Sequence, residues 1–231
     1  MDLSIVLPTY NEKDNIINLI KQILEILKNI ENKEIIVVDD NSPDGTYLSC
    51  KTAFEKNDGI KVLLRKSNKG LANSILDGIK ICKGEYIIVM DTDLTHDPKL
   101  IPKLTYLAKE YDIVSGSRFC AGGLMENKIH YFCSFSFNLL LRIILKTQIQ
   151  DNLGGYFCIK KNTLDSLPFE KIFYGYGEYF FRLLYFAQEK KFNIIEIPAV
   201  YNLRQKGKSK SNFLLLLLKY FFSAMKLRFR L

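Results

Sequence analysis

The chain of 231 residues is 48% apolar and 25% charged, with a mean hydropathy near zero. These values are typical of one globular domain and exclude a disordered, collagen-like or multi-span membrane protein. Eight of the 33 Lys and Arg residues lie beyond residue 203, and no Asp or Glu follows Glu196. The first 203 residues therefore carry 25 charges of each sign. A neutral body with a basic C-terminal segment favours a phosphate or an anionic membrane surface as partner, rather than nucleic acid.

Four short apolar runs rich in β-branched residues alternate with helix-like segments in the first half of the chain. They occupy residues 4–7, 34–38, 61–64 and 86–90. Such alternation predicts a mostly parallel sheet with crossover helices. The first crossover helix is the clearest, because Ile16, Ile20, Ile23 and Leu27 recur at helical spacing. A helix after Pro98 and a strand near residues 112–115 complete this half.

The pattern changes after residue 116. We predict helices at 131–146 and 179–190 and strands at 154–159 and 192–198, followed by a loop at 204–211 that is rich in Lys, Gly and Ser. No low-complexity linker separates the two halves. The sequence therefore predicts one α/β domain at 1–211, with a first half at 1–116 and a second half at 117–211. A terminal helix at 212–231 follows.

The terminal segment and the cysteines indicate where the protein works. The apolar run at 213–225 contains Lys219 and would extend about 20 Å as a helix, against a hydrocarbon core of about 30 Å. We therefore expect an amphipathic helix that lies on a membrane. The apolar run at 3–7 is too short for a signal peptide, and the five cysteines form no C-x-x-C pair. Both features favour the cytoplasm, with the protein peripheral on the cytoplasmic face of a membrane.

Polar residues follow three of the predicted strands, at 8–12, 39–45 and 91–98. In open α/β sheets, ligands bind beyond the carboxyl ends of the strands. Asp91 and Asp93 are separated by one residue, so in an extended chain their carboxylates point to the same side. Two carboxylates can hold a divalent ion whose remaining ligands are phosphate oxygens. The spacing therefore predicts a metal and phosphate site at this edge of the sheet.

Several motifs occur in a fixed order along the whole chain. They are P-T-Y-N-E at 8–12, V-V-D-D-N-S-P-D-G-T at 37–46, K-G-L at 69–71, V-M-D-T-D-L-T-H-D-P at 89–98, G-S-R at 116–118, D-x-x-G-G-Y at 151–156 and R-x-x-G-x-S-K at 204–210. Together they resemble the family 2 glycosyltransferases of the Rossmann-like GT-A fold, most closely the dolichol- or polyprenol-phosphate mannosyltransferase group. The resemblance implies an inverting enzyme that moves a sugar, mannose from GDP-mannose foremost, onto a polyprenyl or dolichyl phosphate.

The resemblance implies roles for residues on the donor side. Pro8, Tyr10, Glu12 and Val38 match positions that cradle the donor nucleoside, and Asp40 matches the carboxylate that reads the nucleobase.

Residues after the fourth strand match the diphosphate and metal site. Asp91 and Asp93 match ligands of Mg²⁺ or Mn²⁺, with Asp93 catalytic, and Thr92 is carried over beside them. The family usually has a Gln where this chain has Thr95, so Thr95 stands in the position of a further ligand.

Basic residues match the acceptor side and the diphosphate. Arg118 matches a catalytic residue that faces the acceptor phosphate. The family often has a second arginine shortly afterwards, where this chain offers Lys128 or His130. Arg204 and Lys210 belong to a basic loop that can close over the diphosphate, with Arg204 catalytic. An acceptor phosphate is already anionic near pH 7, so the reaction requires no general base.

Other interpretations remain open at the level of sequence. The sugar could be glucose or another sugar from a UDP-sugar, and the acceptor could be a saccharide hydroxyl. A binding protein without turnover and a phosphorelay receiver-like domain are the candidates from other classes, the latter because acidic residues follow two strands. Small membrane partner subunits are neither indicated nor excluded. His96 is expected to be a loop or cap residue rather than a metal ligand.

Overall fold

The computed structural model describes residues 3–202 and 213–229. Its centre is a seven-stranded sheet in the order β3-β2-β1-β4-β7-β5-β8, and a two-stranded sheet, β6-β9, lies beside it. Every neighbouring pair in the large sheet is parallel except those that β7 makes with β4 and β5. The strands are β1 (Leu3–Thr9), β2 (Lys33–Asp39), β3 (Ile60–Leu64), β4 (Tyr86–Val89), β5 (Ile113–Ser117), β6 (Leu124–Met125), β7 (Phe157–Lys160), β8 (Ile194–Pro198) and β9 (Val200–Tyr201).

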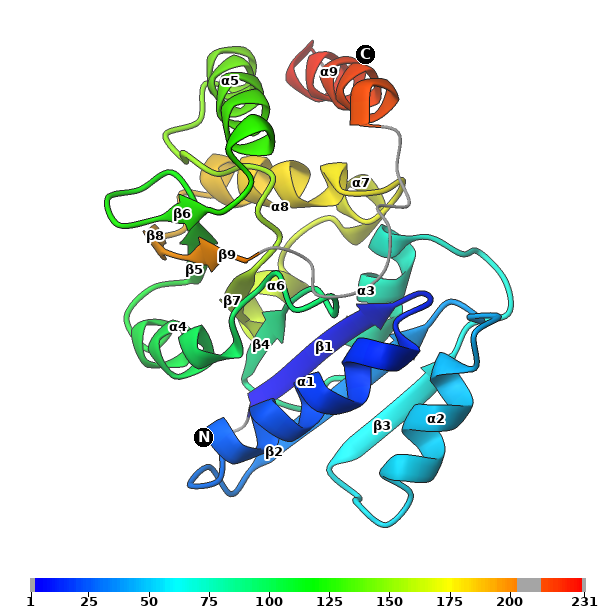
Figure 1. The fold of residues 1–231 in the computed structure, drawn as a ribbon. Coiled ribbons are helices and arrows are strands. Elements are labelled where there is room, and N and C mark those ends of the chain that lie inside the picture. Colours follow the sequence, from blue (N-terminus) through cyan, green and yellow to red (C-terminus); the bar gives the residue numbers. More distant parts are fainter. Residues whose placement is uncertain (1–2, 203–212, 230–231) are drawn as a thin grey trace.

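Helices cover both faces of the sheet (Figure 1). One apolar cluster joins one face to α1, α2 and α4, and a second joins the other face to α3, α6, α7 and α8. The helices are α1 (Lys13–Ile26), α2 (Thr46–Ala53), α3 (Leu71–Ile81), the 3₁₀ helix η1 (Pro98–Leu100), α4 (Ile101–Leu107), α5 (Lys128–Leu145), α6 (Lys161–Asp165), α7 (Phe169–Ile172), α8 (Glu178–Glu189) and α9 (Phe213–Phe229).

The first half follows the hydrophobic pattern of its sequence. All seven residues of β1 are buried, as expected for a parallel strand covered on both faces. On α1, the side chains of Ile16, Ile20 and Ile23 are fully buried, so the helical spacing seen in the sequence is the face that packs on the sheet. The predicted mostly parallel sheet with flanking helices is confirmed.

The two halves of the chain share this one sheet. β7 belongs to the second half, yet it lies between β4 and β5 of the first half and is antiparallel to both. β8 then pairs in parallel with β5. The sequence pattern did not predict this insertion, nor the short helices α6 and α7 or the small sheet β6-β9. The boundary at residue 116 is therefore a change of sequence pattern within one continuous sheet.

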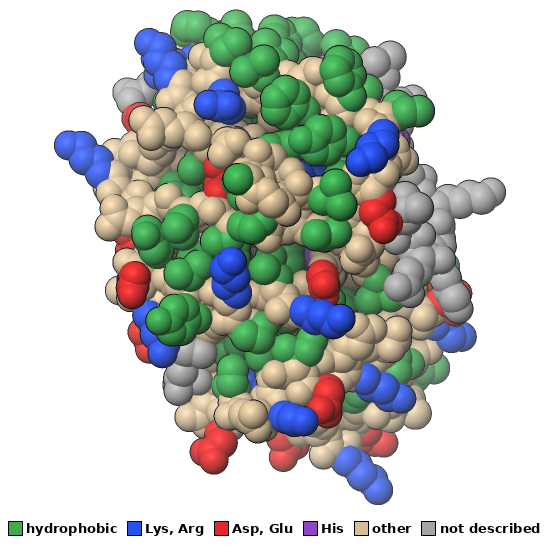
Figure 2. Space-filling model, turned by 60° about the vertical axis from the view of Figure 1, so that its left-hand side comes forward, with side chains coloured by type: hydrophobic (Ala, Val, Ile, Leu, Met, Phe, Trp, Pro, Cys, Tyr) green, Lys and Arg blue, Asp and Glu red, His purple; other side chains and the backbone are tan. Residues whose placement is uncertain are grey.

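A third apolar cluster joins α5, α8 and α9 at one end of the molecule. Phe137 and Leu141 of α5 pack with Phe181 of α8 and with Tyr220 and Ala224 of α9. The opposite sides of α5 and α9 are exposed, and they form the surface that we call the apolar face. Its residues are Ile129, Phe132, Leu139 and Ile143 on α5 and Leu218, Phe222 and Phe229 on α9. Figure 2 shows hydrophobic side chains gathered at this end of the molecule.

Candidate active site

A cavity of about 850 Å³ opens at the carboxyl ends of β1, β2 and β4. This is the edge at which the sequence places the three polar segments. The first half of the chain contributes Pro8, Thr9, Tyr10, Glu12, Asp40, Lys69, Gly70, Leu71, Ser74, Asp91, Thr92 and Asp93. The second half contributes Leu153, Gly154, Gly155, Tyr176, Gly177, Tyr179, Phe180, Leu216, Lys219 and Tyr220.

The Asp91 and Asp93 carboxylates lie on the cavity wall, in the loop that follows β4. The chain turns sharply there, since Leu94 adopts a left-handed conformation with φ of 64°. Asp93 holds the turn together: its Oδ1 accepts hydrogen bonds from the Thr95 amide at 3.1 Å and from the Thr95 hydroxyl at 2.6 Å. The Asp91 side chain is about half exposed, whereas Asp93 is buried. The prediction that these two carboxylates share one site agrees with their positions.

His96 lies behind the Asp91 loop and is fully buried. Its ring stacks on Tyr156 with the centroids 4.8 Å apart. Nδ1 accepts a hydrogen bond from the Asp91 amide at 2.9 Å, so the neutral ring carries its proton on Nε2. Burial lowers the pKa of His96 from 6.5 to about 4, although the charge of Asp93 opposes this shift. His96 therefore supports the loop as a buried neutral group.

Acid is expected to destabilise the fold through His96. The unfolded chain takes up this proton near pH 6.5 and the folded chain only near pH 4. The free energy of unfolding should therefore fall as the pH drops from about 6.5 to about 4, by up to about 1.4 kcal/mol per pH unit from this group. Urea unfolding at several pH values checks this. His96→Asn should flatten the profile in that window, and equal profiles for His96→Asn and the wild type would contradict the assignment.

Asp40 is buried in the cavity wall, and we call the part of the wall that it forms with Gly70 and Ser74 the Asp40 shelf. The Arg65 guanidinium pairs with its carboxylate, which also accepts hydrogen bonds from the Ser74 hydroxyl at 2.7 Å and from the Gly70 amide at 2.6 Å. Gly70 has φ of +133°, a conformation open to glycine and strained for other residues. Arg65 also donates to Asp77 at 2.7 Å. Asp40 thus fixes the loop between β3 and α3, and the sequence pattern alone did not indicate Arg65 as its partner.

The loop after β1 forms the neighbouring wall. Pro8, Tyr10 and Glu12 all line the cavity, as predicted. Glu12 is buried and accepts a hydrogen bond from the Asn15 side chain at 2.8 Å. The Thr92 hydroxyl donates to the Pro8 carbonyl oxygen at 3.3 Å, which joins this loop to the one after β4.

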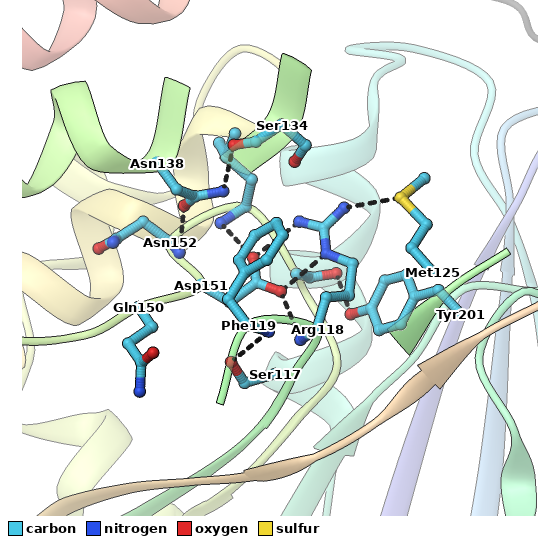
Figure 3. A network of polar contacts seen from close by, with 12 residues as sticks. Ser117, Arg118, Phe119, Met125, Ser134, Asn138, Gln150, Asp151, Asn152 and Tyr201 are labelled. Atoms are coloured by element: carbon cyan, nitrogen blue, oxygen red, sulfur yellow. Dashed lines mark hydrogen bonds and ion pairs between the residues drawn. The ribbon is translucent and has the colours of Figure 1, made fainter. Parts of the chain in front are cut away.

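Arg118 lies behind the cavity wall in a buried ion pair with Asp151 (Figure 3). Its Nε and Nη2 donate to the two carboxylate oxygens at 2.8 and 2.7 Å, and the guanidinium lies over the rings of Phe119 and Tyr201. Burial disfavours the charged form, but the Asp151 carboxylate outweighs it, and the pKa of Arg118 is raised. In this structure the Arg118 guanidinium is enclosed and is not a wall residue, and its predicted contact with an acceptor phosphate stays a prediction.

The Arg118–Asp151 pair instead braces a segment that lines the cavity. Asp151 is followed by Leu153, Gly154 and Gly155, all on the wall. The Tyr201 hydroxyl donates to the Gly154 carbonyl oxygen at 2.9 Å.

Breaking the Arg118–Asp151 pair is expected to lower the free energy of unfolding. Asp151→Leu would leave the Arg118 charge buried without its partner, which typically costs about 3–5 kcal/mol in the free energy of unfolding. The double variant Arg118→Met with Asp151→Leu should be less destabilised than either of the single variants Arg118→Met and Asp151→Leu, since it leaves no charge behind. Urea unfolding of the three variants measures this. A double variant as unstable as the sum of the two singles would contradict the proposed coupling.

Other predicted site residues lie away from the cavity wall. The Val38 side chain is fully buried in the core, in the apolar cluster that the sheet forms with α3 and α8. The Thr95 hydroxyl is used by Asp93. His130 lies in the exposed first turn of α5, where its amide donates to the Asn127 side chain at 3.0 Å. None of these three side chains lines the cavity, and their predicted substrate contacts stay predictions. Arg204 and Lys210 lie outside the described residues.

The second half of the chain supplies one wall of the cavity, and sequence motifs indicate only some of its residues. The D-x-x-G-G-Y motif indicated Gly154 and Gly155. No sequence signal distinguished Lys219 and Tyr220 of α9 from other residues of an apolar helix. The two residues reach the wall because α9 packs on α5 and α8, a contact between segments far apart in the sequence.

The carboxylates of Asp91 and Asp93 suit a cation that also binds a substrate. Within residues 3–202 and 213–229, no group of three or more His, Cys, Asp or Glu side chains could hold a metal ion by itself. Asp91 and Asp93 offer carboxylate oxygens on the cavity wall. Magnesium-type ions are commonly held by one or two carboxylates together with substrate phosphates.

Comparisons with known proteins agree with this architecture. The chain is 34% identical over 217 residues to a dolichol-phosphate mannosyltransferase of Pyrococcus furiosus, an alignment that covers 91% of this chain and 59% of that protein. It is 26% identical over 216 residues to a dolichol-phosphate mannosyltransferase of Saccharomyces cerevisiae, covering 91% and 81%. The chain thus spans less than two thirds of the length of the archaeal relative.

A solved structure shares the fold. Glucosyl-3-phosphoglycerate synthase from Mycobacterium tuberculosis, in complex with Mn²⁺, UDP and glucosyl-3-phosphoglycerate, matches with a TM-score of 0.72 at 18% identity, covering 98% of this chain and 79% of that chain. The predicted GT-A-like fold is therefore confirmed. Residues 4–167 match the family model described as glycosyl transferase family 2. This match extends over more than half of the sequence, and the chain belongs to glycosyl transferase family 2.

Proposed function

We propose that the protein transfers mannose from GDP-mannose to the phosphate of a polyprenol or dolichol. The observation that carries the proposal is the composition of one cavity. Its wall contains a carboxylate pair at the end of β4, the loops after β1 and β2, and residues of α9, whose outer side belongs to the apolar face. The relatives that cover most of this chain are named dolichol-phosphate mannosyltransferases, which supports the choice of sugar and acceptor.

The donor nucleoside is proposed to lie on the wall formed by Pro8, Tyr10, Glu12 and the Asp40 shelf. Tyr10 lies on this wall and is 42% exposed, and its ring is proposed to contact the base. The Asp40 carboxylate is shared among Arg65, Ser74 and Gly70. It would therefore act on the base mainly by holding the Gly70 loop in place.

The diphosphate is proposed to lie at Asp91 and Asp93, with Mg²⁺ or Mn²⁺. Mn²⁺ occurs in the mycobacterial enzyme of the same fold, which supports a divalent ion here. Such an ion supplies positive charge that stabilises a departing diphosphate. Asp93 is held by Thr95, so its carboxylate is preorganised. From the R-x-x-G-x-S-K motif of the sequence, we also propose that Arg204 and Lys210 bring positive charge to the diphosphate.

The reaction is proposed to be a single displacement that inverts the anomeric carbon. An oxygen of the acceptor phosphate forms the new bond to this carbon as the bond to the nucleoside diphosphate breaks. The acceptor oxygen is already deprotonated near pH 7, so no side chain needs to remove a proton.

The protein is proposed to bind a membrane from its surface, through the apolar face. α5 is the one described helix that is long and apolar enough to cross a membrane. Its 18 residues would extend about 27 Å. However, Phe137 and Leu141 are packed against α8 and α9, so only one side of α5 is available to lipid. A helix with one apolar side and basic neighbours suits the headgroup region of an anionic leaflet.

A panel of nucleotide sugars tests the proposal directly. The full chain is incubated with polyprenyl phosphate, Mg²⁺ or Mn²⁺ and GDP-mannose, UDP-glucose or another donor, and the lipid product is identified by mass. Formation of polyprenyl phosphate mannose supports the proposal. Transfer from UDP-glucose, or to a saccharide hydroxyl, would favour the alternative substrates. Absence of product with every donor would favour a binding protein without turnover. The receiver-like alternative is excluded by the family membership.

A further inference from the structure

The cavity wall carries few cations for the phosphates that it is proposed to bind. Among the described residues, Lys69 and Lys219 are the basic side chains on the wall. Arg65 and Arg118 lie behind it and are paired with Asp40 and Asp151. Lys69 adjoins Gly70, on the shelf that is proposed for the nucleotide. Lys219 comes from α9, and it makes no ion pair with the residues that the structure describes.

Polar contacts fix the rotation of α9 over the cavity. The Tyr220 hydroxyl accepts a hydrogen bond from the Gly177 amide at 3.1 Å. One turn further on, the Ser223 hydroxyl accepts from Nη1 of the fully buried Arg182 at 3.0 Å. Arg182 also donates to the Ile172 carbonyl oxygen at 3.0 Å. α9 is therefore joined to the segment that carries Gly177 on the cavity wall. Because Tyr220 makes this contact, the adjacent Lys219 is also held at the wall.

The position of Lys219 around α9 indicates which part of a lipid phosphate it could contact. Successive residues of an α-helix are about 100° apart. With Tyr220 and Ala224 facing the core, Leu218 and Phe222 point to the opposite side, on the apolar face. Lys219 lies on the flank between these two sides. A phosphate bound there would lie in the cavity while the hydrocarbon chain attached to it could leave along the apolar face.

We propose that Lys219 binds the phosphate of the lipid acceptor, a cationic contact for which it is better placed than Arg118 and His130, neither of which lines the cavity. The inference rests on the proposed function, since it names a residue for the acceptor of that reaction. The ammonium group would donate hydrogen bonds to the phosphate oxygens and hold the acceptor at the side of the cavity that is next to the membrane.

Lys226 provides a matched control within the same helix. It is seven residues beyond Lys219, so it lies on the same flank, about 10.5 Å further along the helix. It is exposed like Lys219 but does not line the cavity. The two lysines therefore share charge, helix and exposure, and they differ in access to the site.

The experiment compares Lys219→Gln, Lys219→Arg and Lys226→Gln with the wild type, using a short water-soluble prenyl phosphate as acceptor. Lys219→Gln is expected to raise the acceptor KM about tenfold or more, as loss of a charged hydrogen bond would, and to leave the KM for GDP-mannose unchanged. Lys219→Arg should restore most of the acceptor affinity, and Lys226→Gln should match the wild type. Calorimetric titration with the prenyl phosphate measures binding without turnover.

The possible outcomes separate the inference from the proposed function. An unchanged acceptor KM in Lys219→Gln, or an equal effect of Lys226→Gln, would overturn the inference. A rise in the donor KM instead would also overturn it and assign Lys219 to the diphosphate. If the wild type transfers no sugar but binds prenyl phosphate, and Lys219→Gln weakens that binding, the inference survives and the proposed function fails.

Discussion

Asp93→Asn is expected to reduce transfer by about a hundredfold to a thousandfold, the loss typical of removing one group that stabilises transition-state charge. Asn is preferred to Ala because its amide oxygen can still accept the hydrogen bond from the Thr95 amide, which Asp93 Oδ1 accepts at 3.1 Å. The turn after β4 should then survive while the negative charge is lost. The measurement is kcat/KM for mannose transfer, with circular dichroism as the check on folding.

Asp97→Asn is the matched control for this experiment. Asp97 lies four residues further along the same loop, caps η1 by accepting a hydrogen bond from the Lys99 amide at 2.9 Å, and does not line the cavity. It should retain activity close to that of the wild type. A chelator should remove the activity of the wild type, and added Mg²⁺ or Mn²⁺ should restore it. Near-normal transfer by Asp93→Asn, or activity that a chelator does not affect, would remove the carboxylate pair from the proposed site.

The second large effect is expected at the membrane. Phe132 and Phe222 are 70% and 67% exposed, one on each helix of the apolar face. Burying one such side chain is worth roughly 1.5–3 kcal/mol, so the double variant Phe132→Asp with Phe222→Asp, which loses two of them, should bind anionic vesicles at least about a hundredfold more weakly. Vesicle sedimentation measures the binding. Raising the salt concentration should weaken wild-type binding without abolishing it, because only the contribution of the basic residues is screened.

A charge on another exposed apolar residue controls for a general effect of the substitution. Leu48 is 65% exposed, but it lies on α2, away from the apolar face. Leu48→Asp should sediment with vesicles as the wild type does. Deletion of α9 would be a poorer test, since Tyr220 and Ala224 belong to the core with α5 and α8. If the double variant still binds as tightly as the wild type, the membrane contact lies elsewhere on the protein.

The sequence predicted those parts of the fold that depend on local pattern. The strands of the first half are continuous apolar runs and were predicted close to their observed bounds, and α1 was predicted from its apolar side at helical spacing. The position of β7 between β4 and β5 was not predicted, because strand order depends on pairing between distant segments. The same reason explains why α9 was predicted as a helix but not as part of the cavity wall.

In the candidate site, too, local features were predictable and contacts between distant residues were not. Asp91, Asp93, Tyr10 and Glu12 were predicted because polar residues at strand ends face the ligand edge of such sheets. The roles of paired residues were not predictable from motifs. A motif match places Arg118 near the acceptor, but only the folded chain shows that Asp151 encloses its charge.

The strand order also bears on how the protein is made. β4 carries the carboxylate pair at its end and β5 leads into Arg118, yet these neighbours in sequence are held apart by a strand that is synthesised some forty residues after β5 begins. Until β7 emerges from the ribosome, β4 has an open edge and β5 has no place in the sheet. A fragment that ends at residue 116 should therefore expose an unpaired strand and aggregate, rather than persist as a separate nucleotide-binding unit.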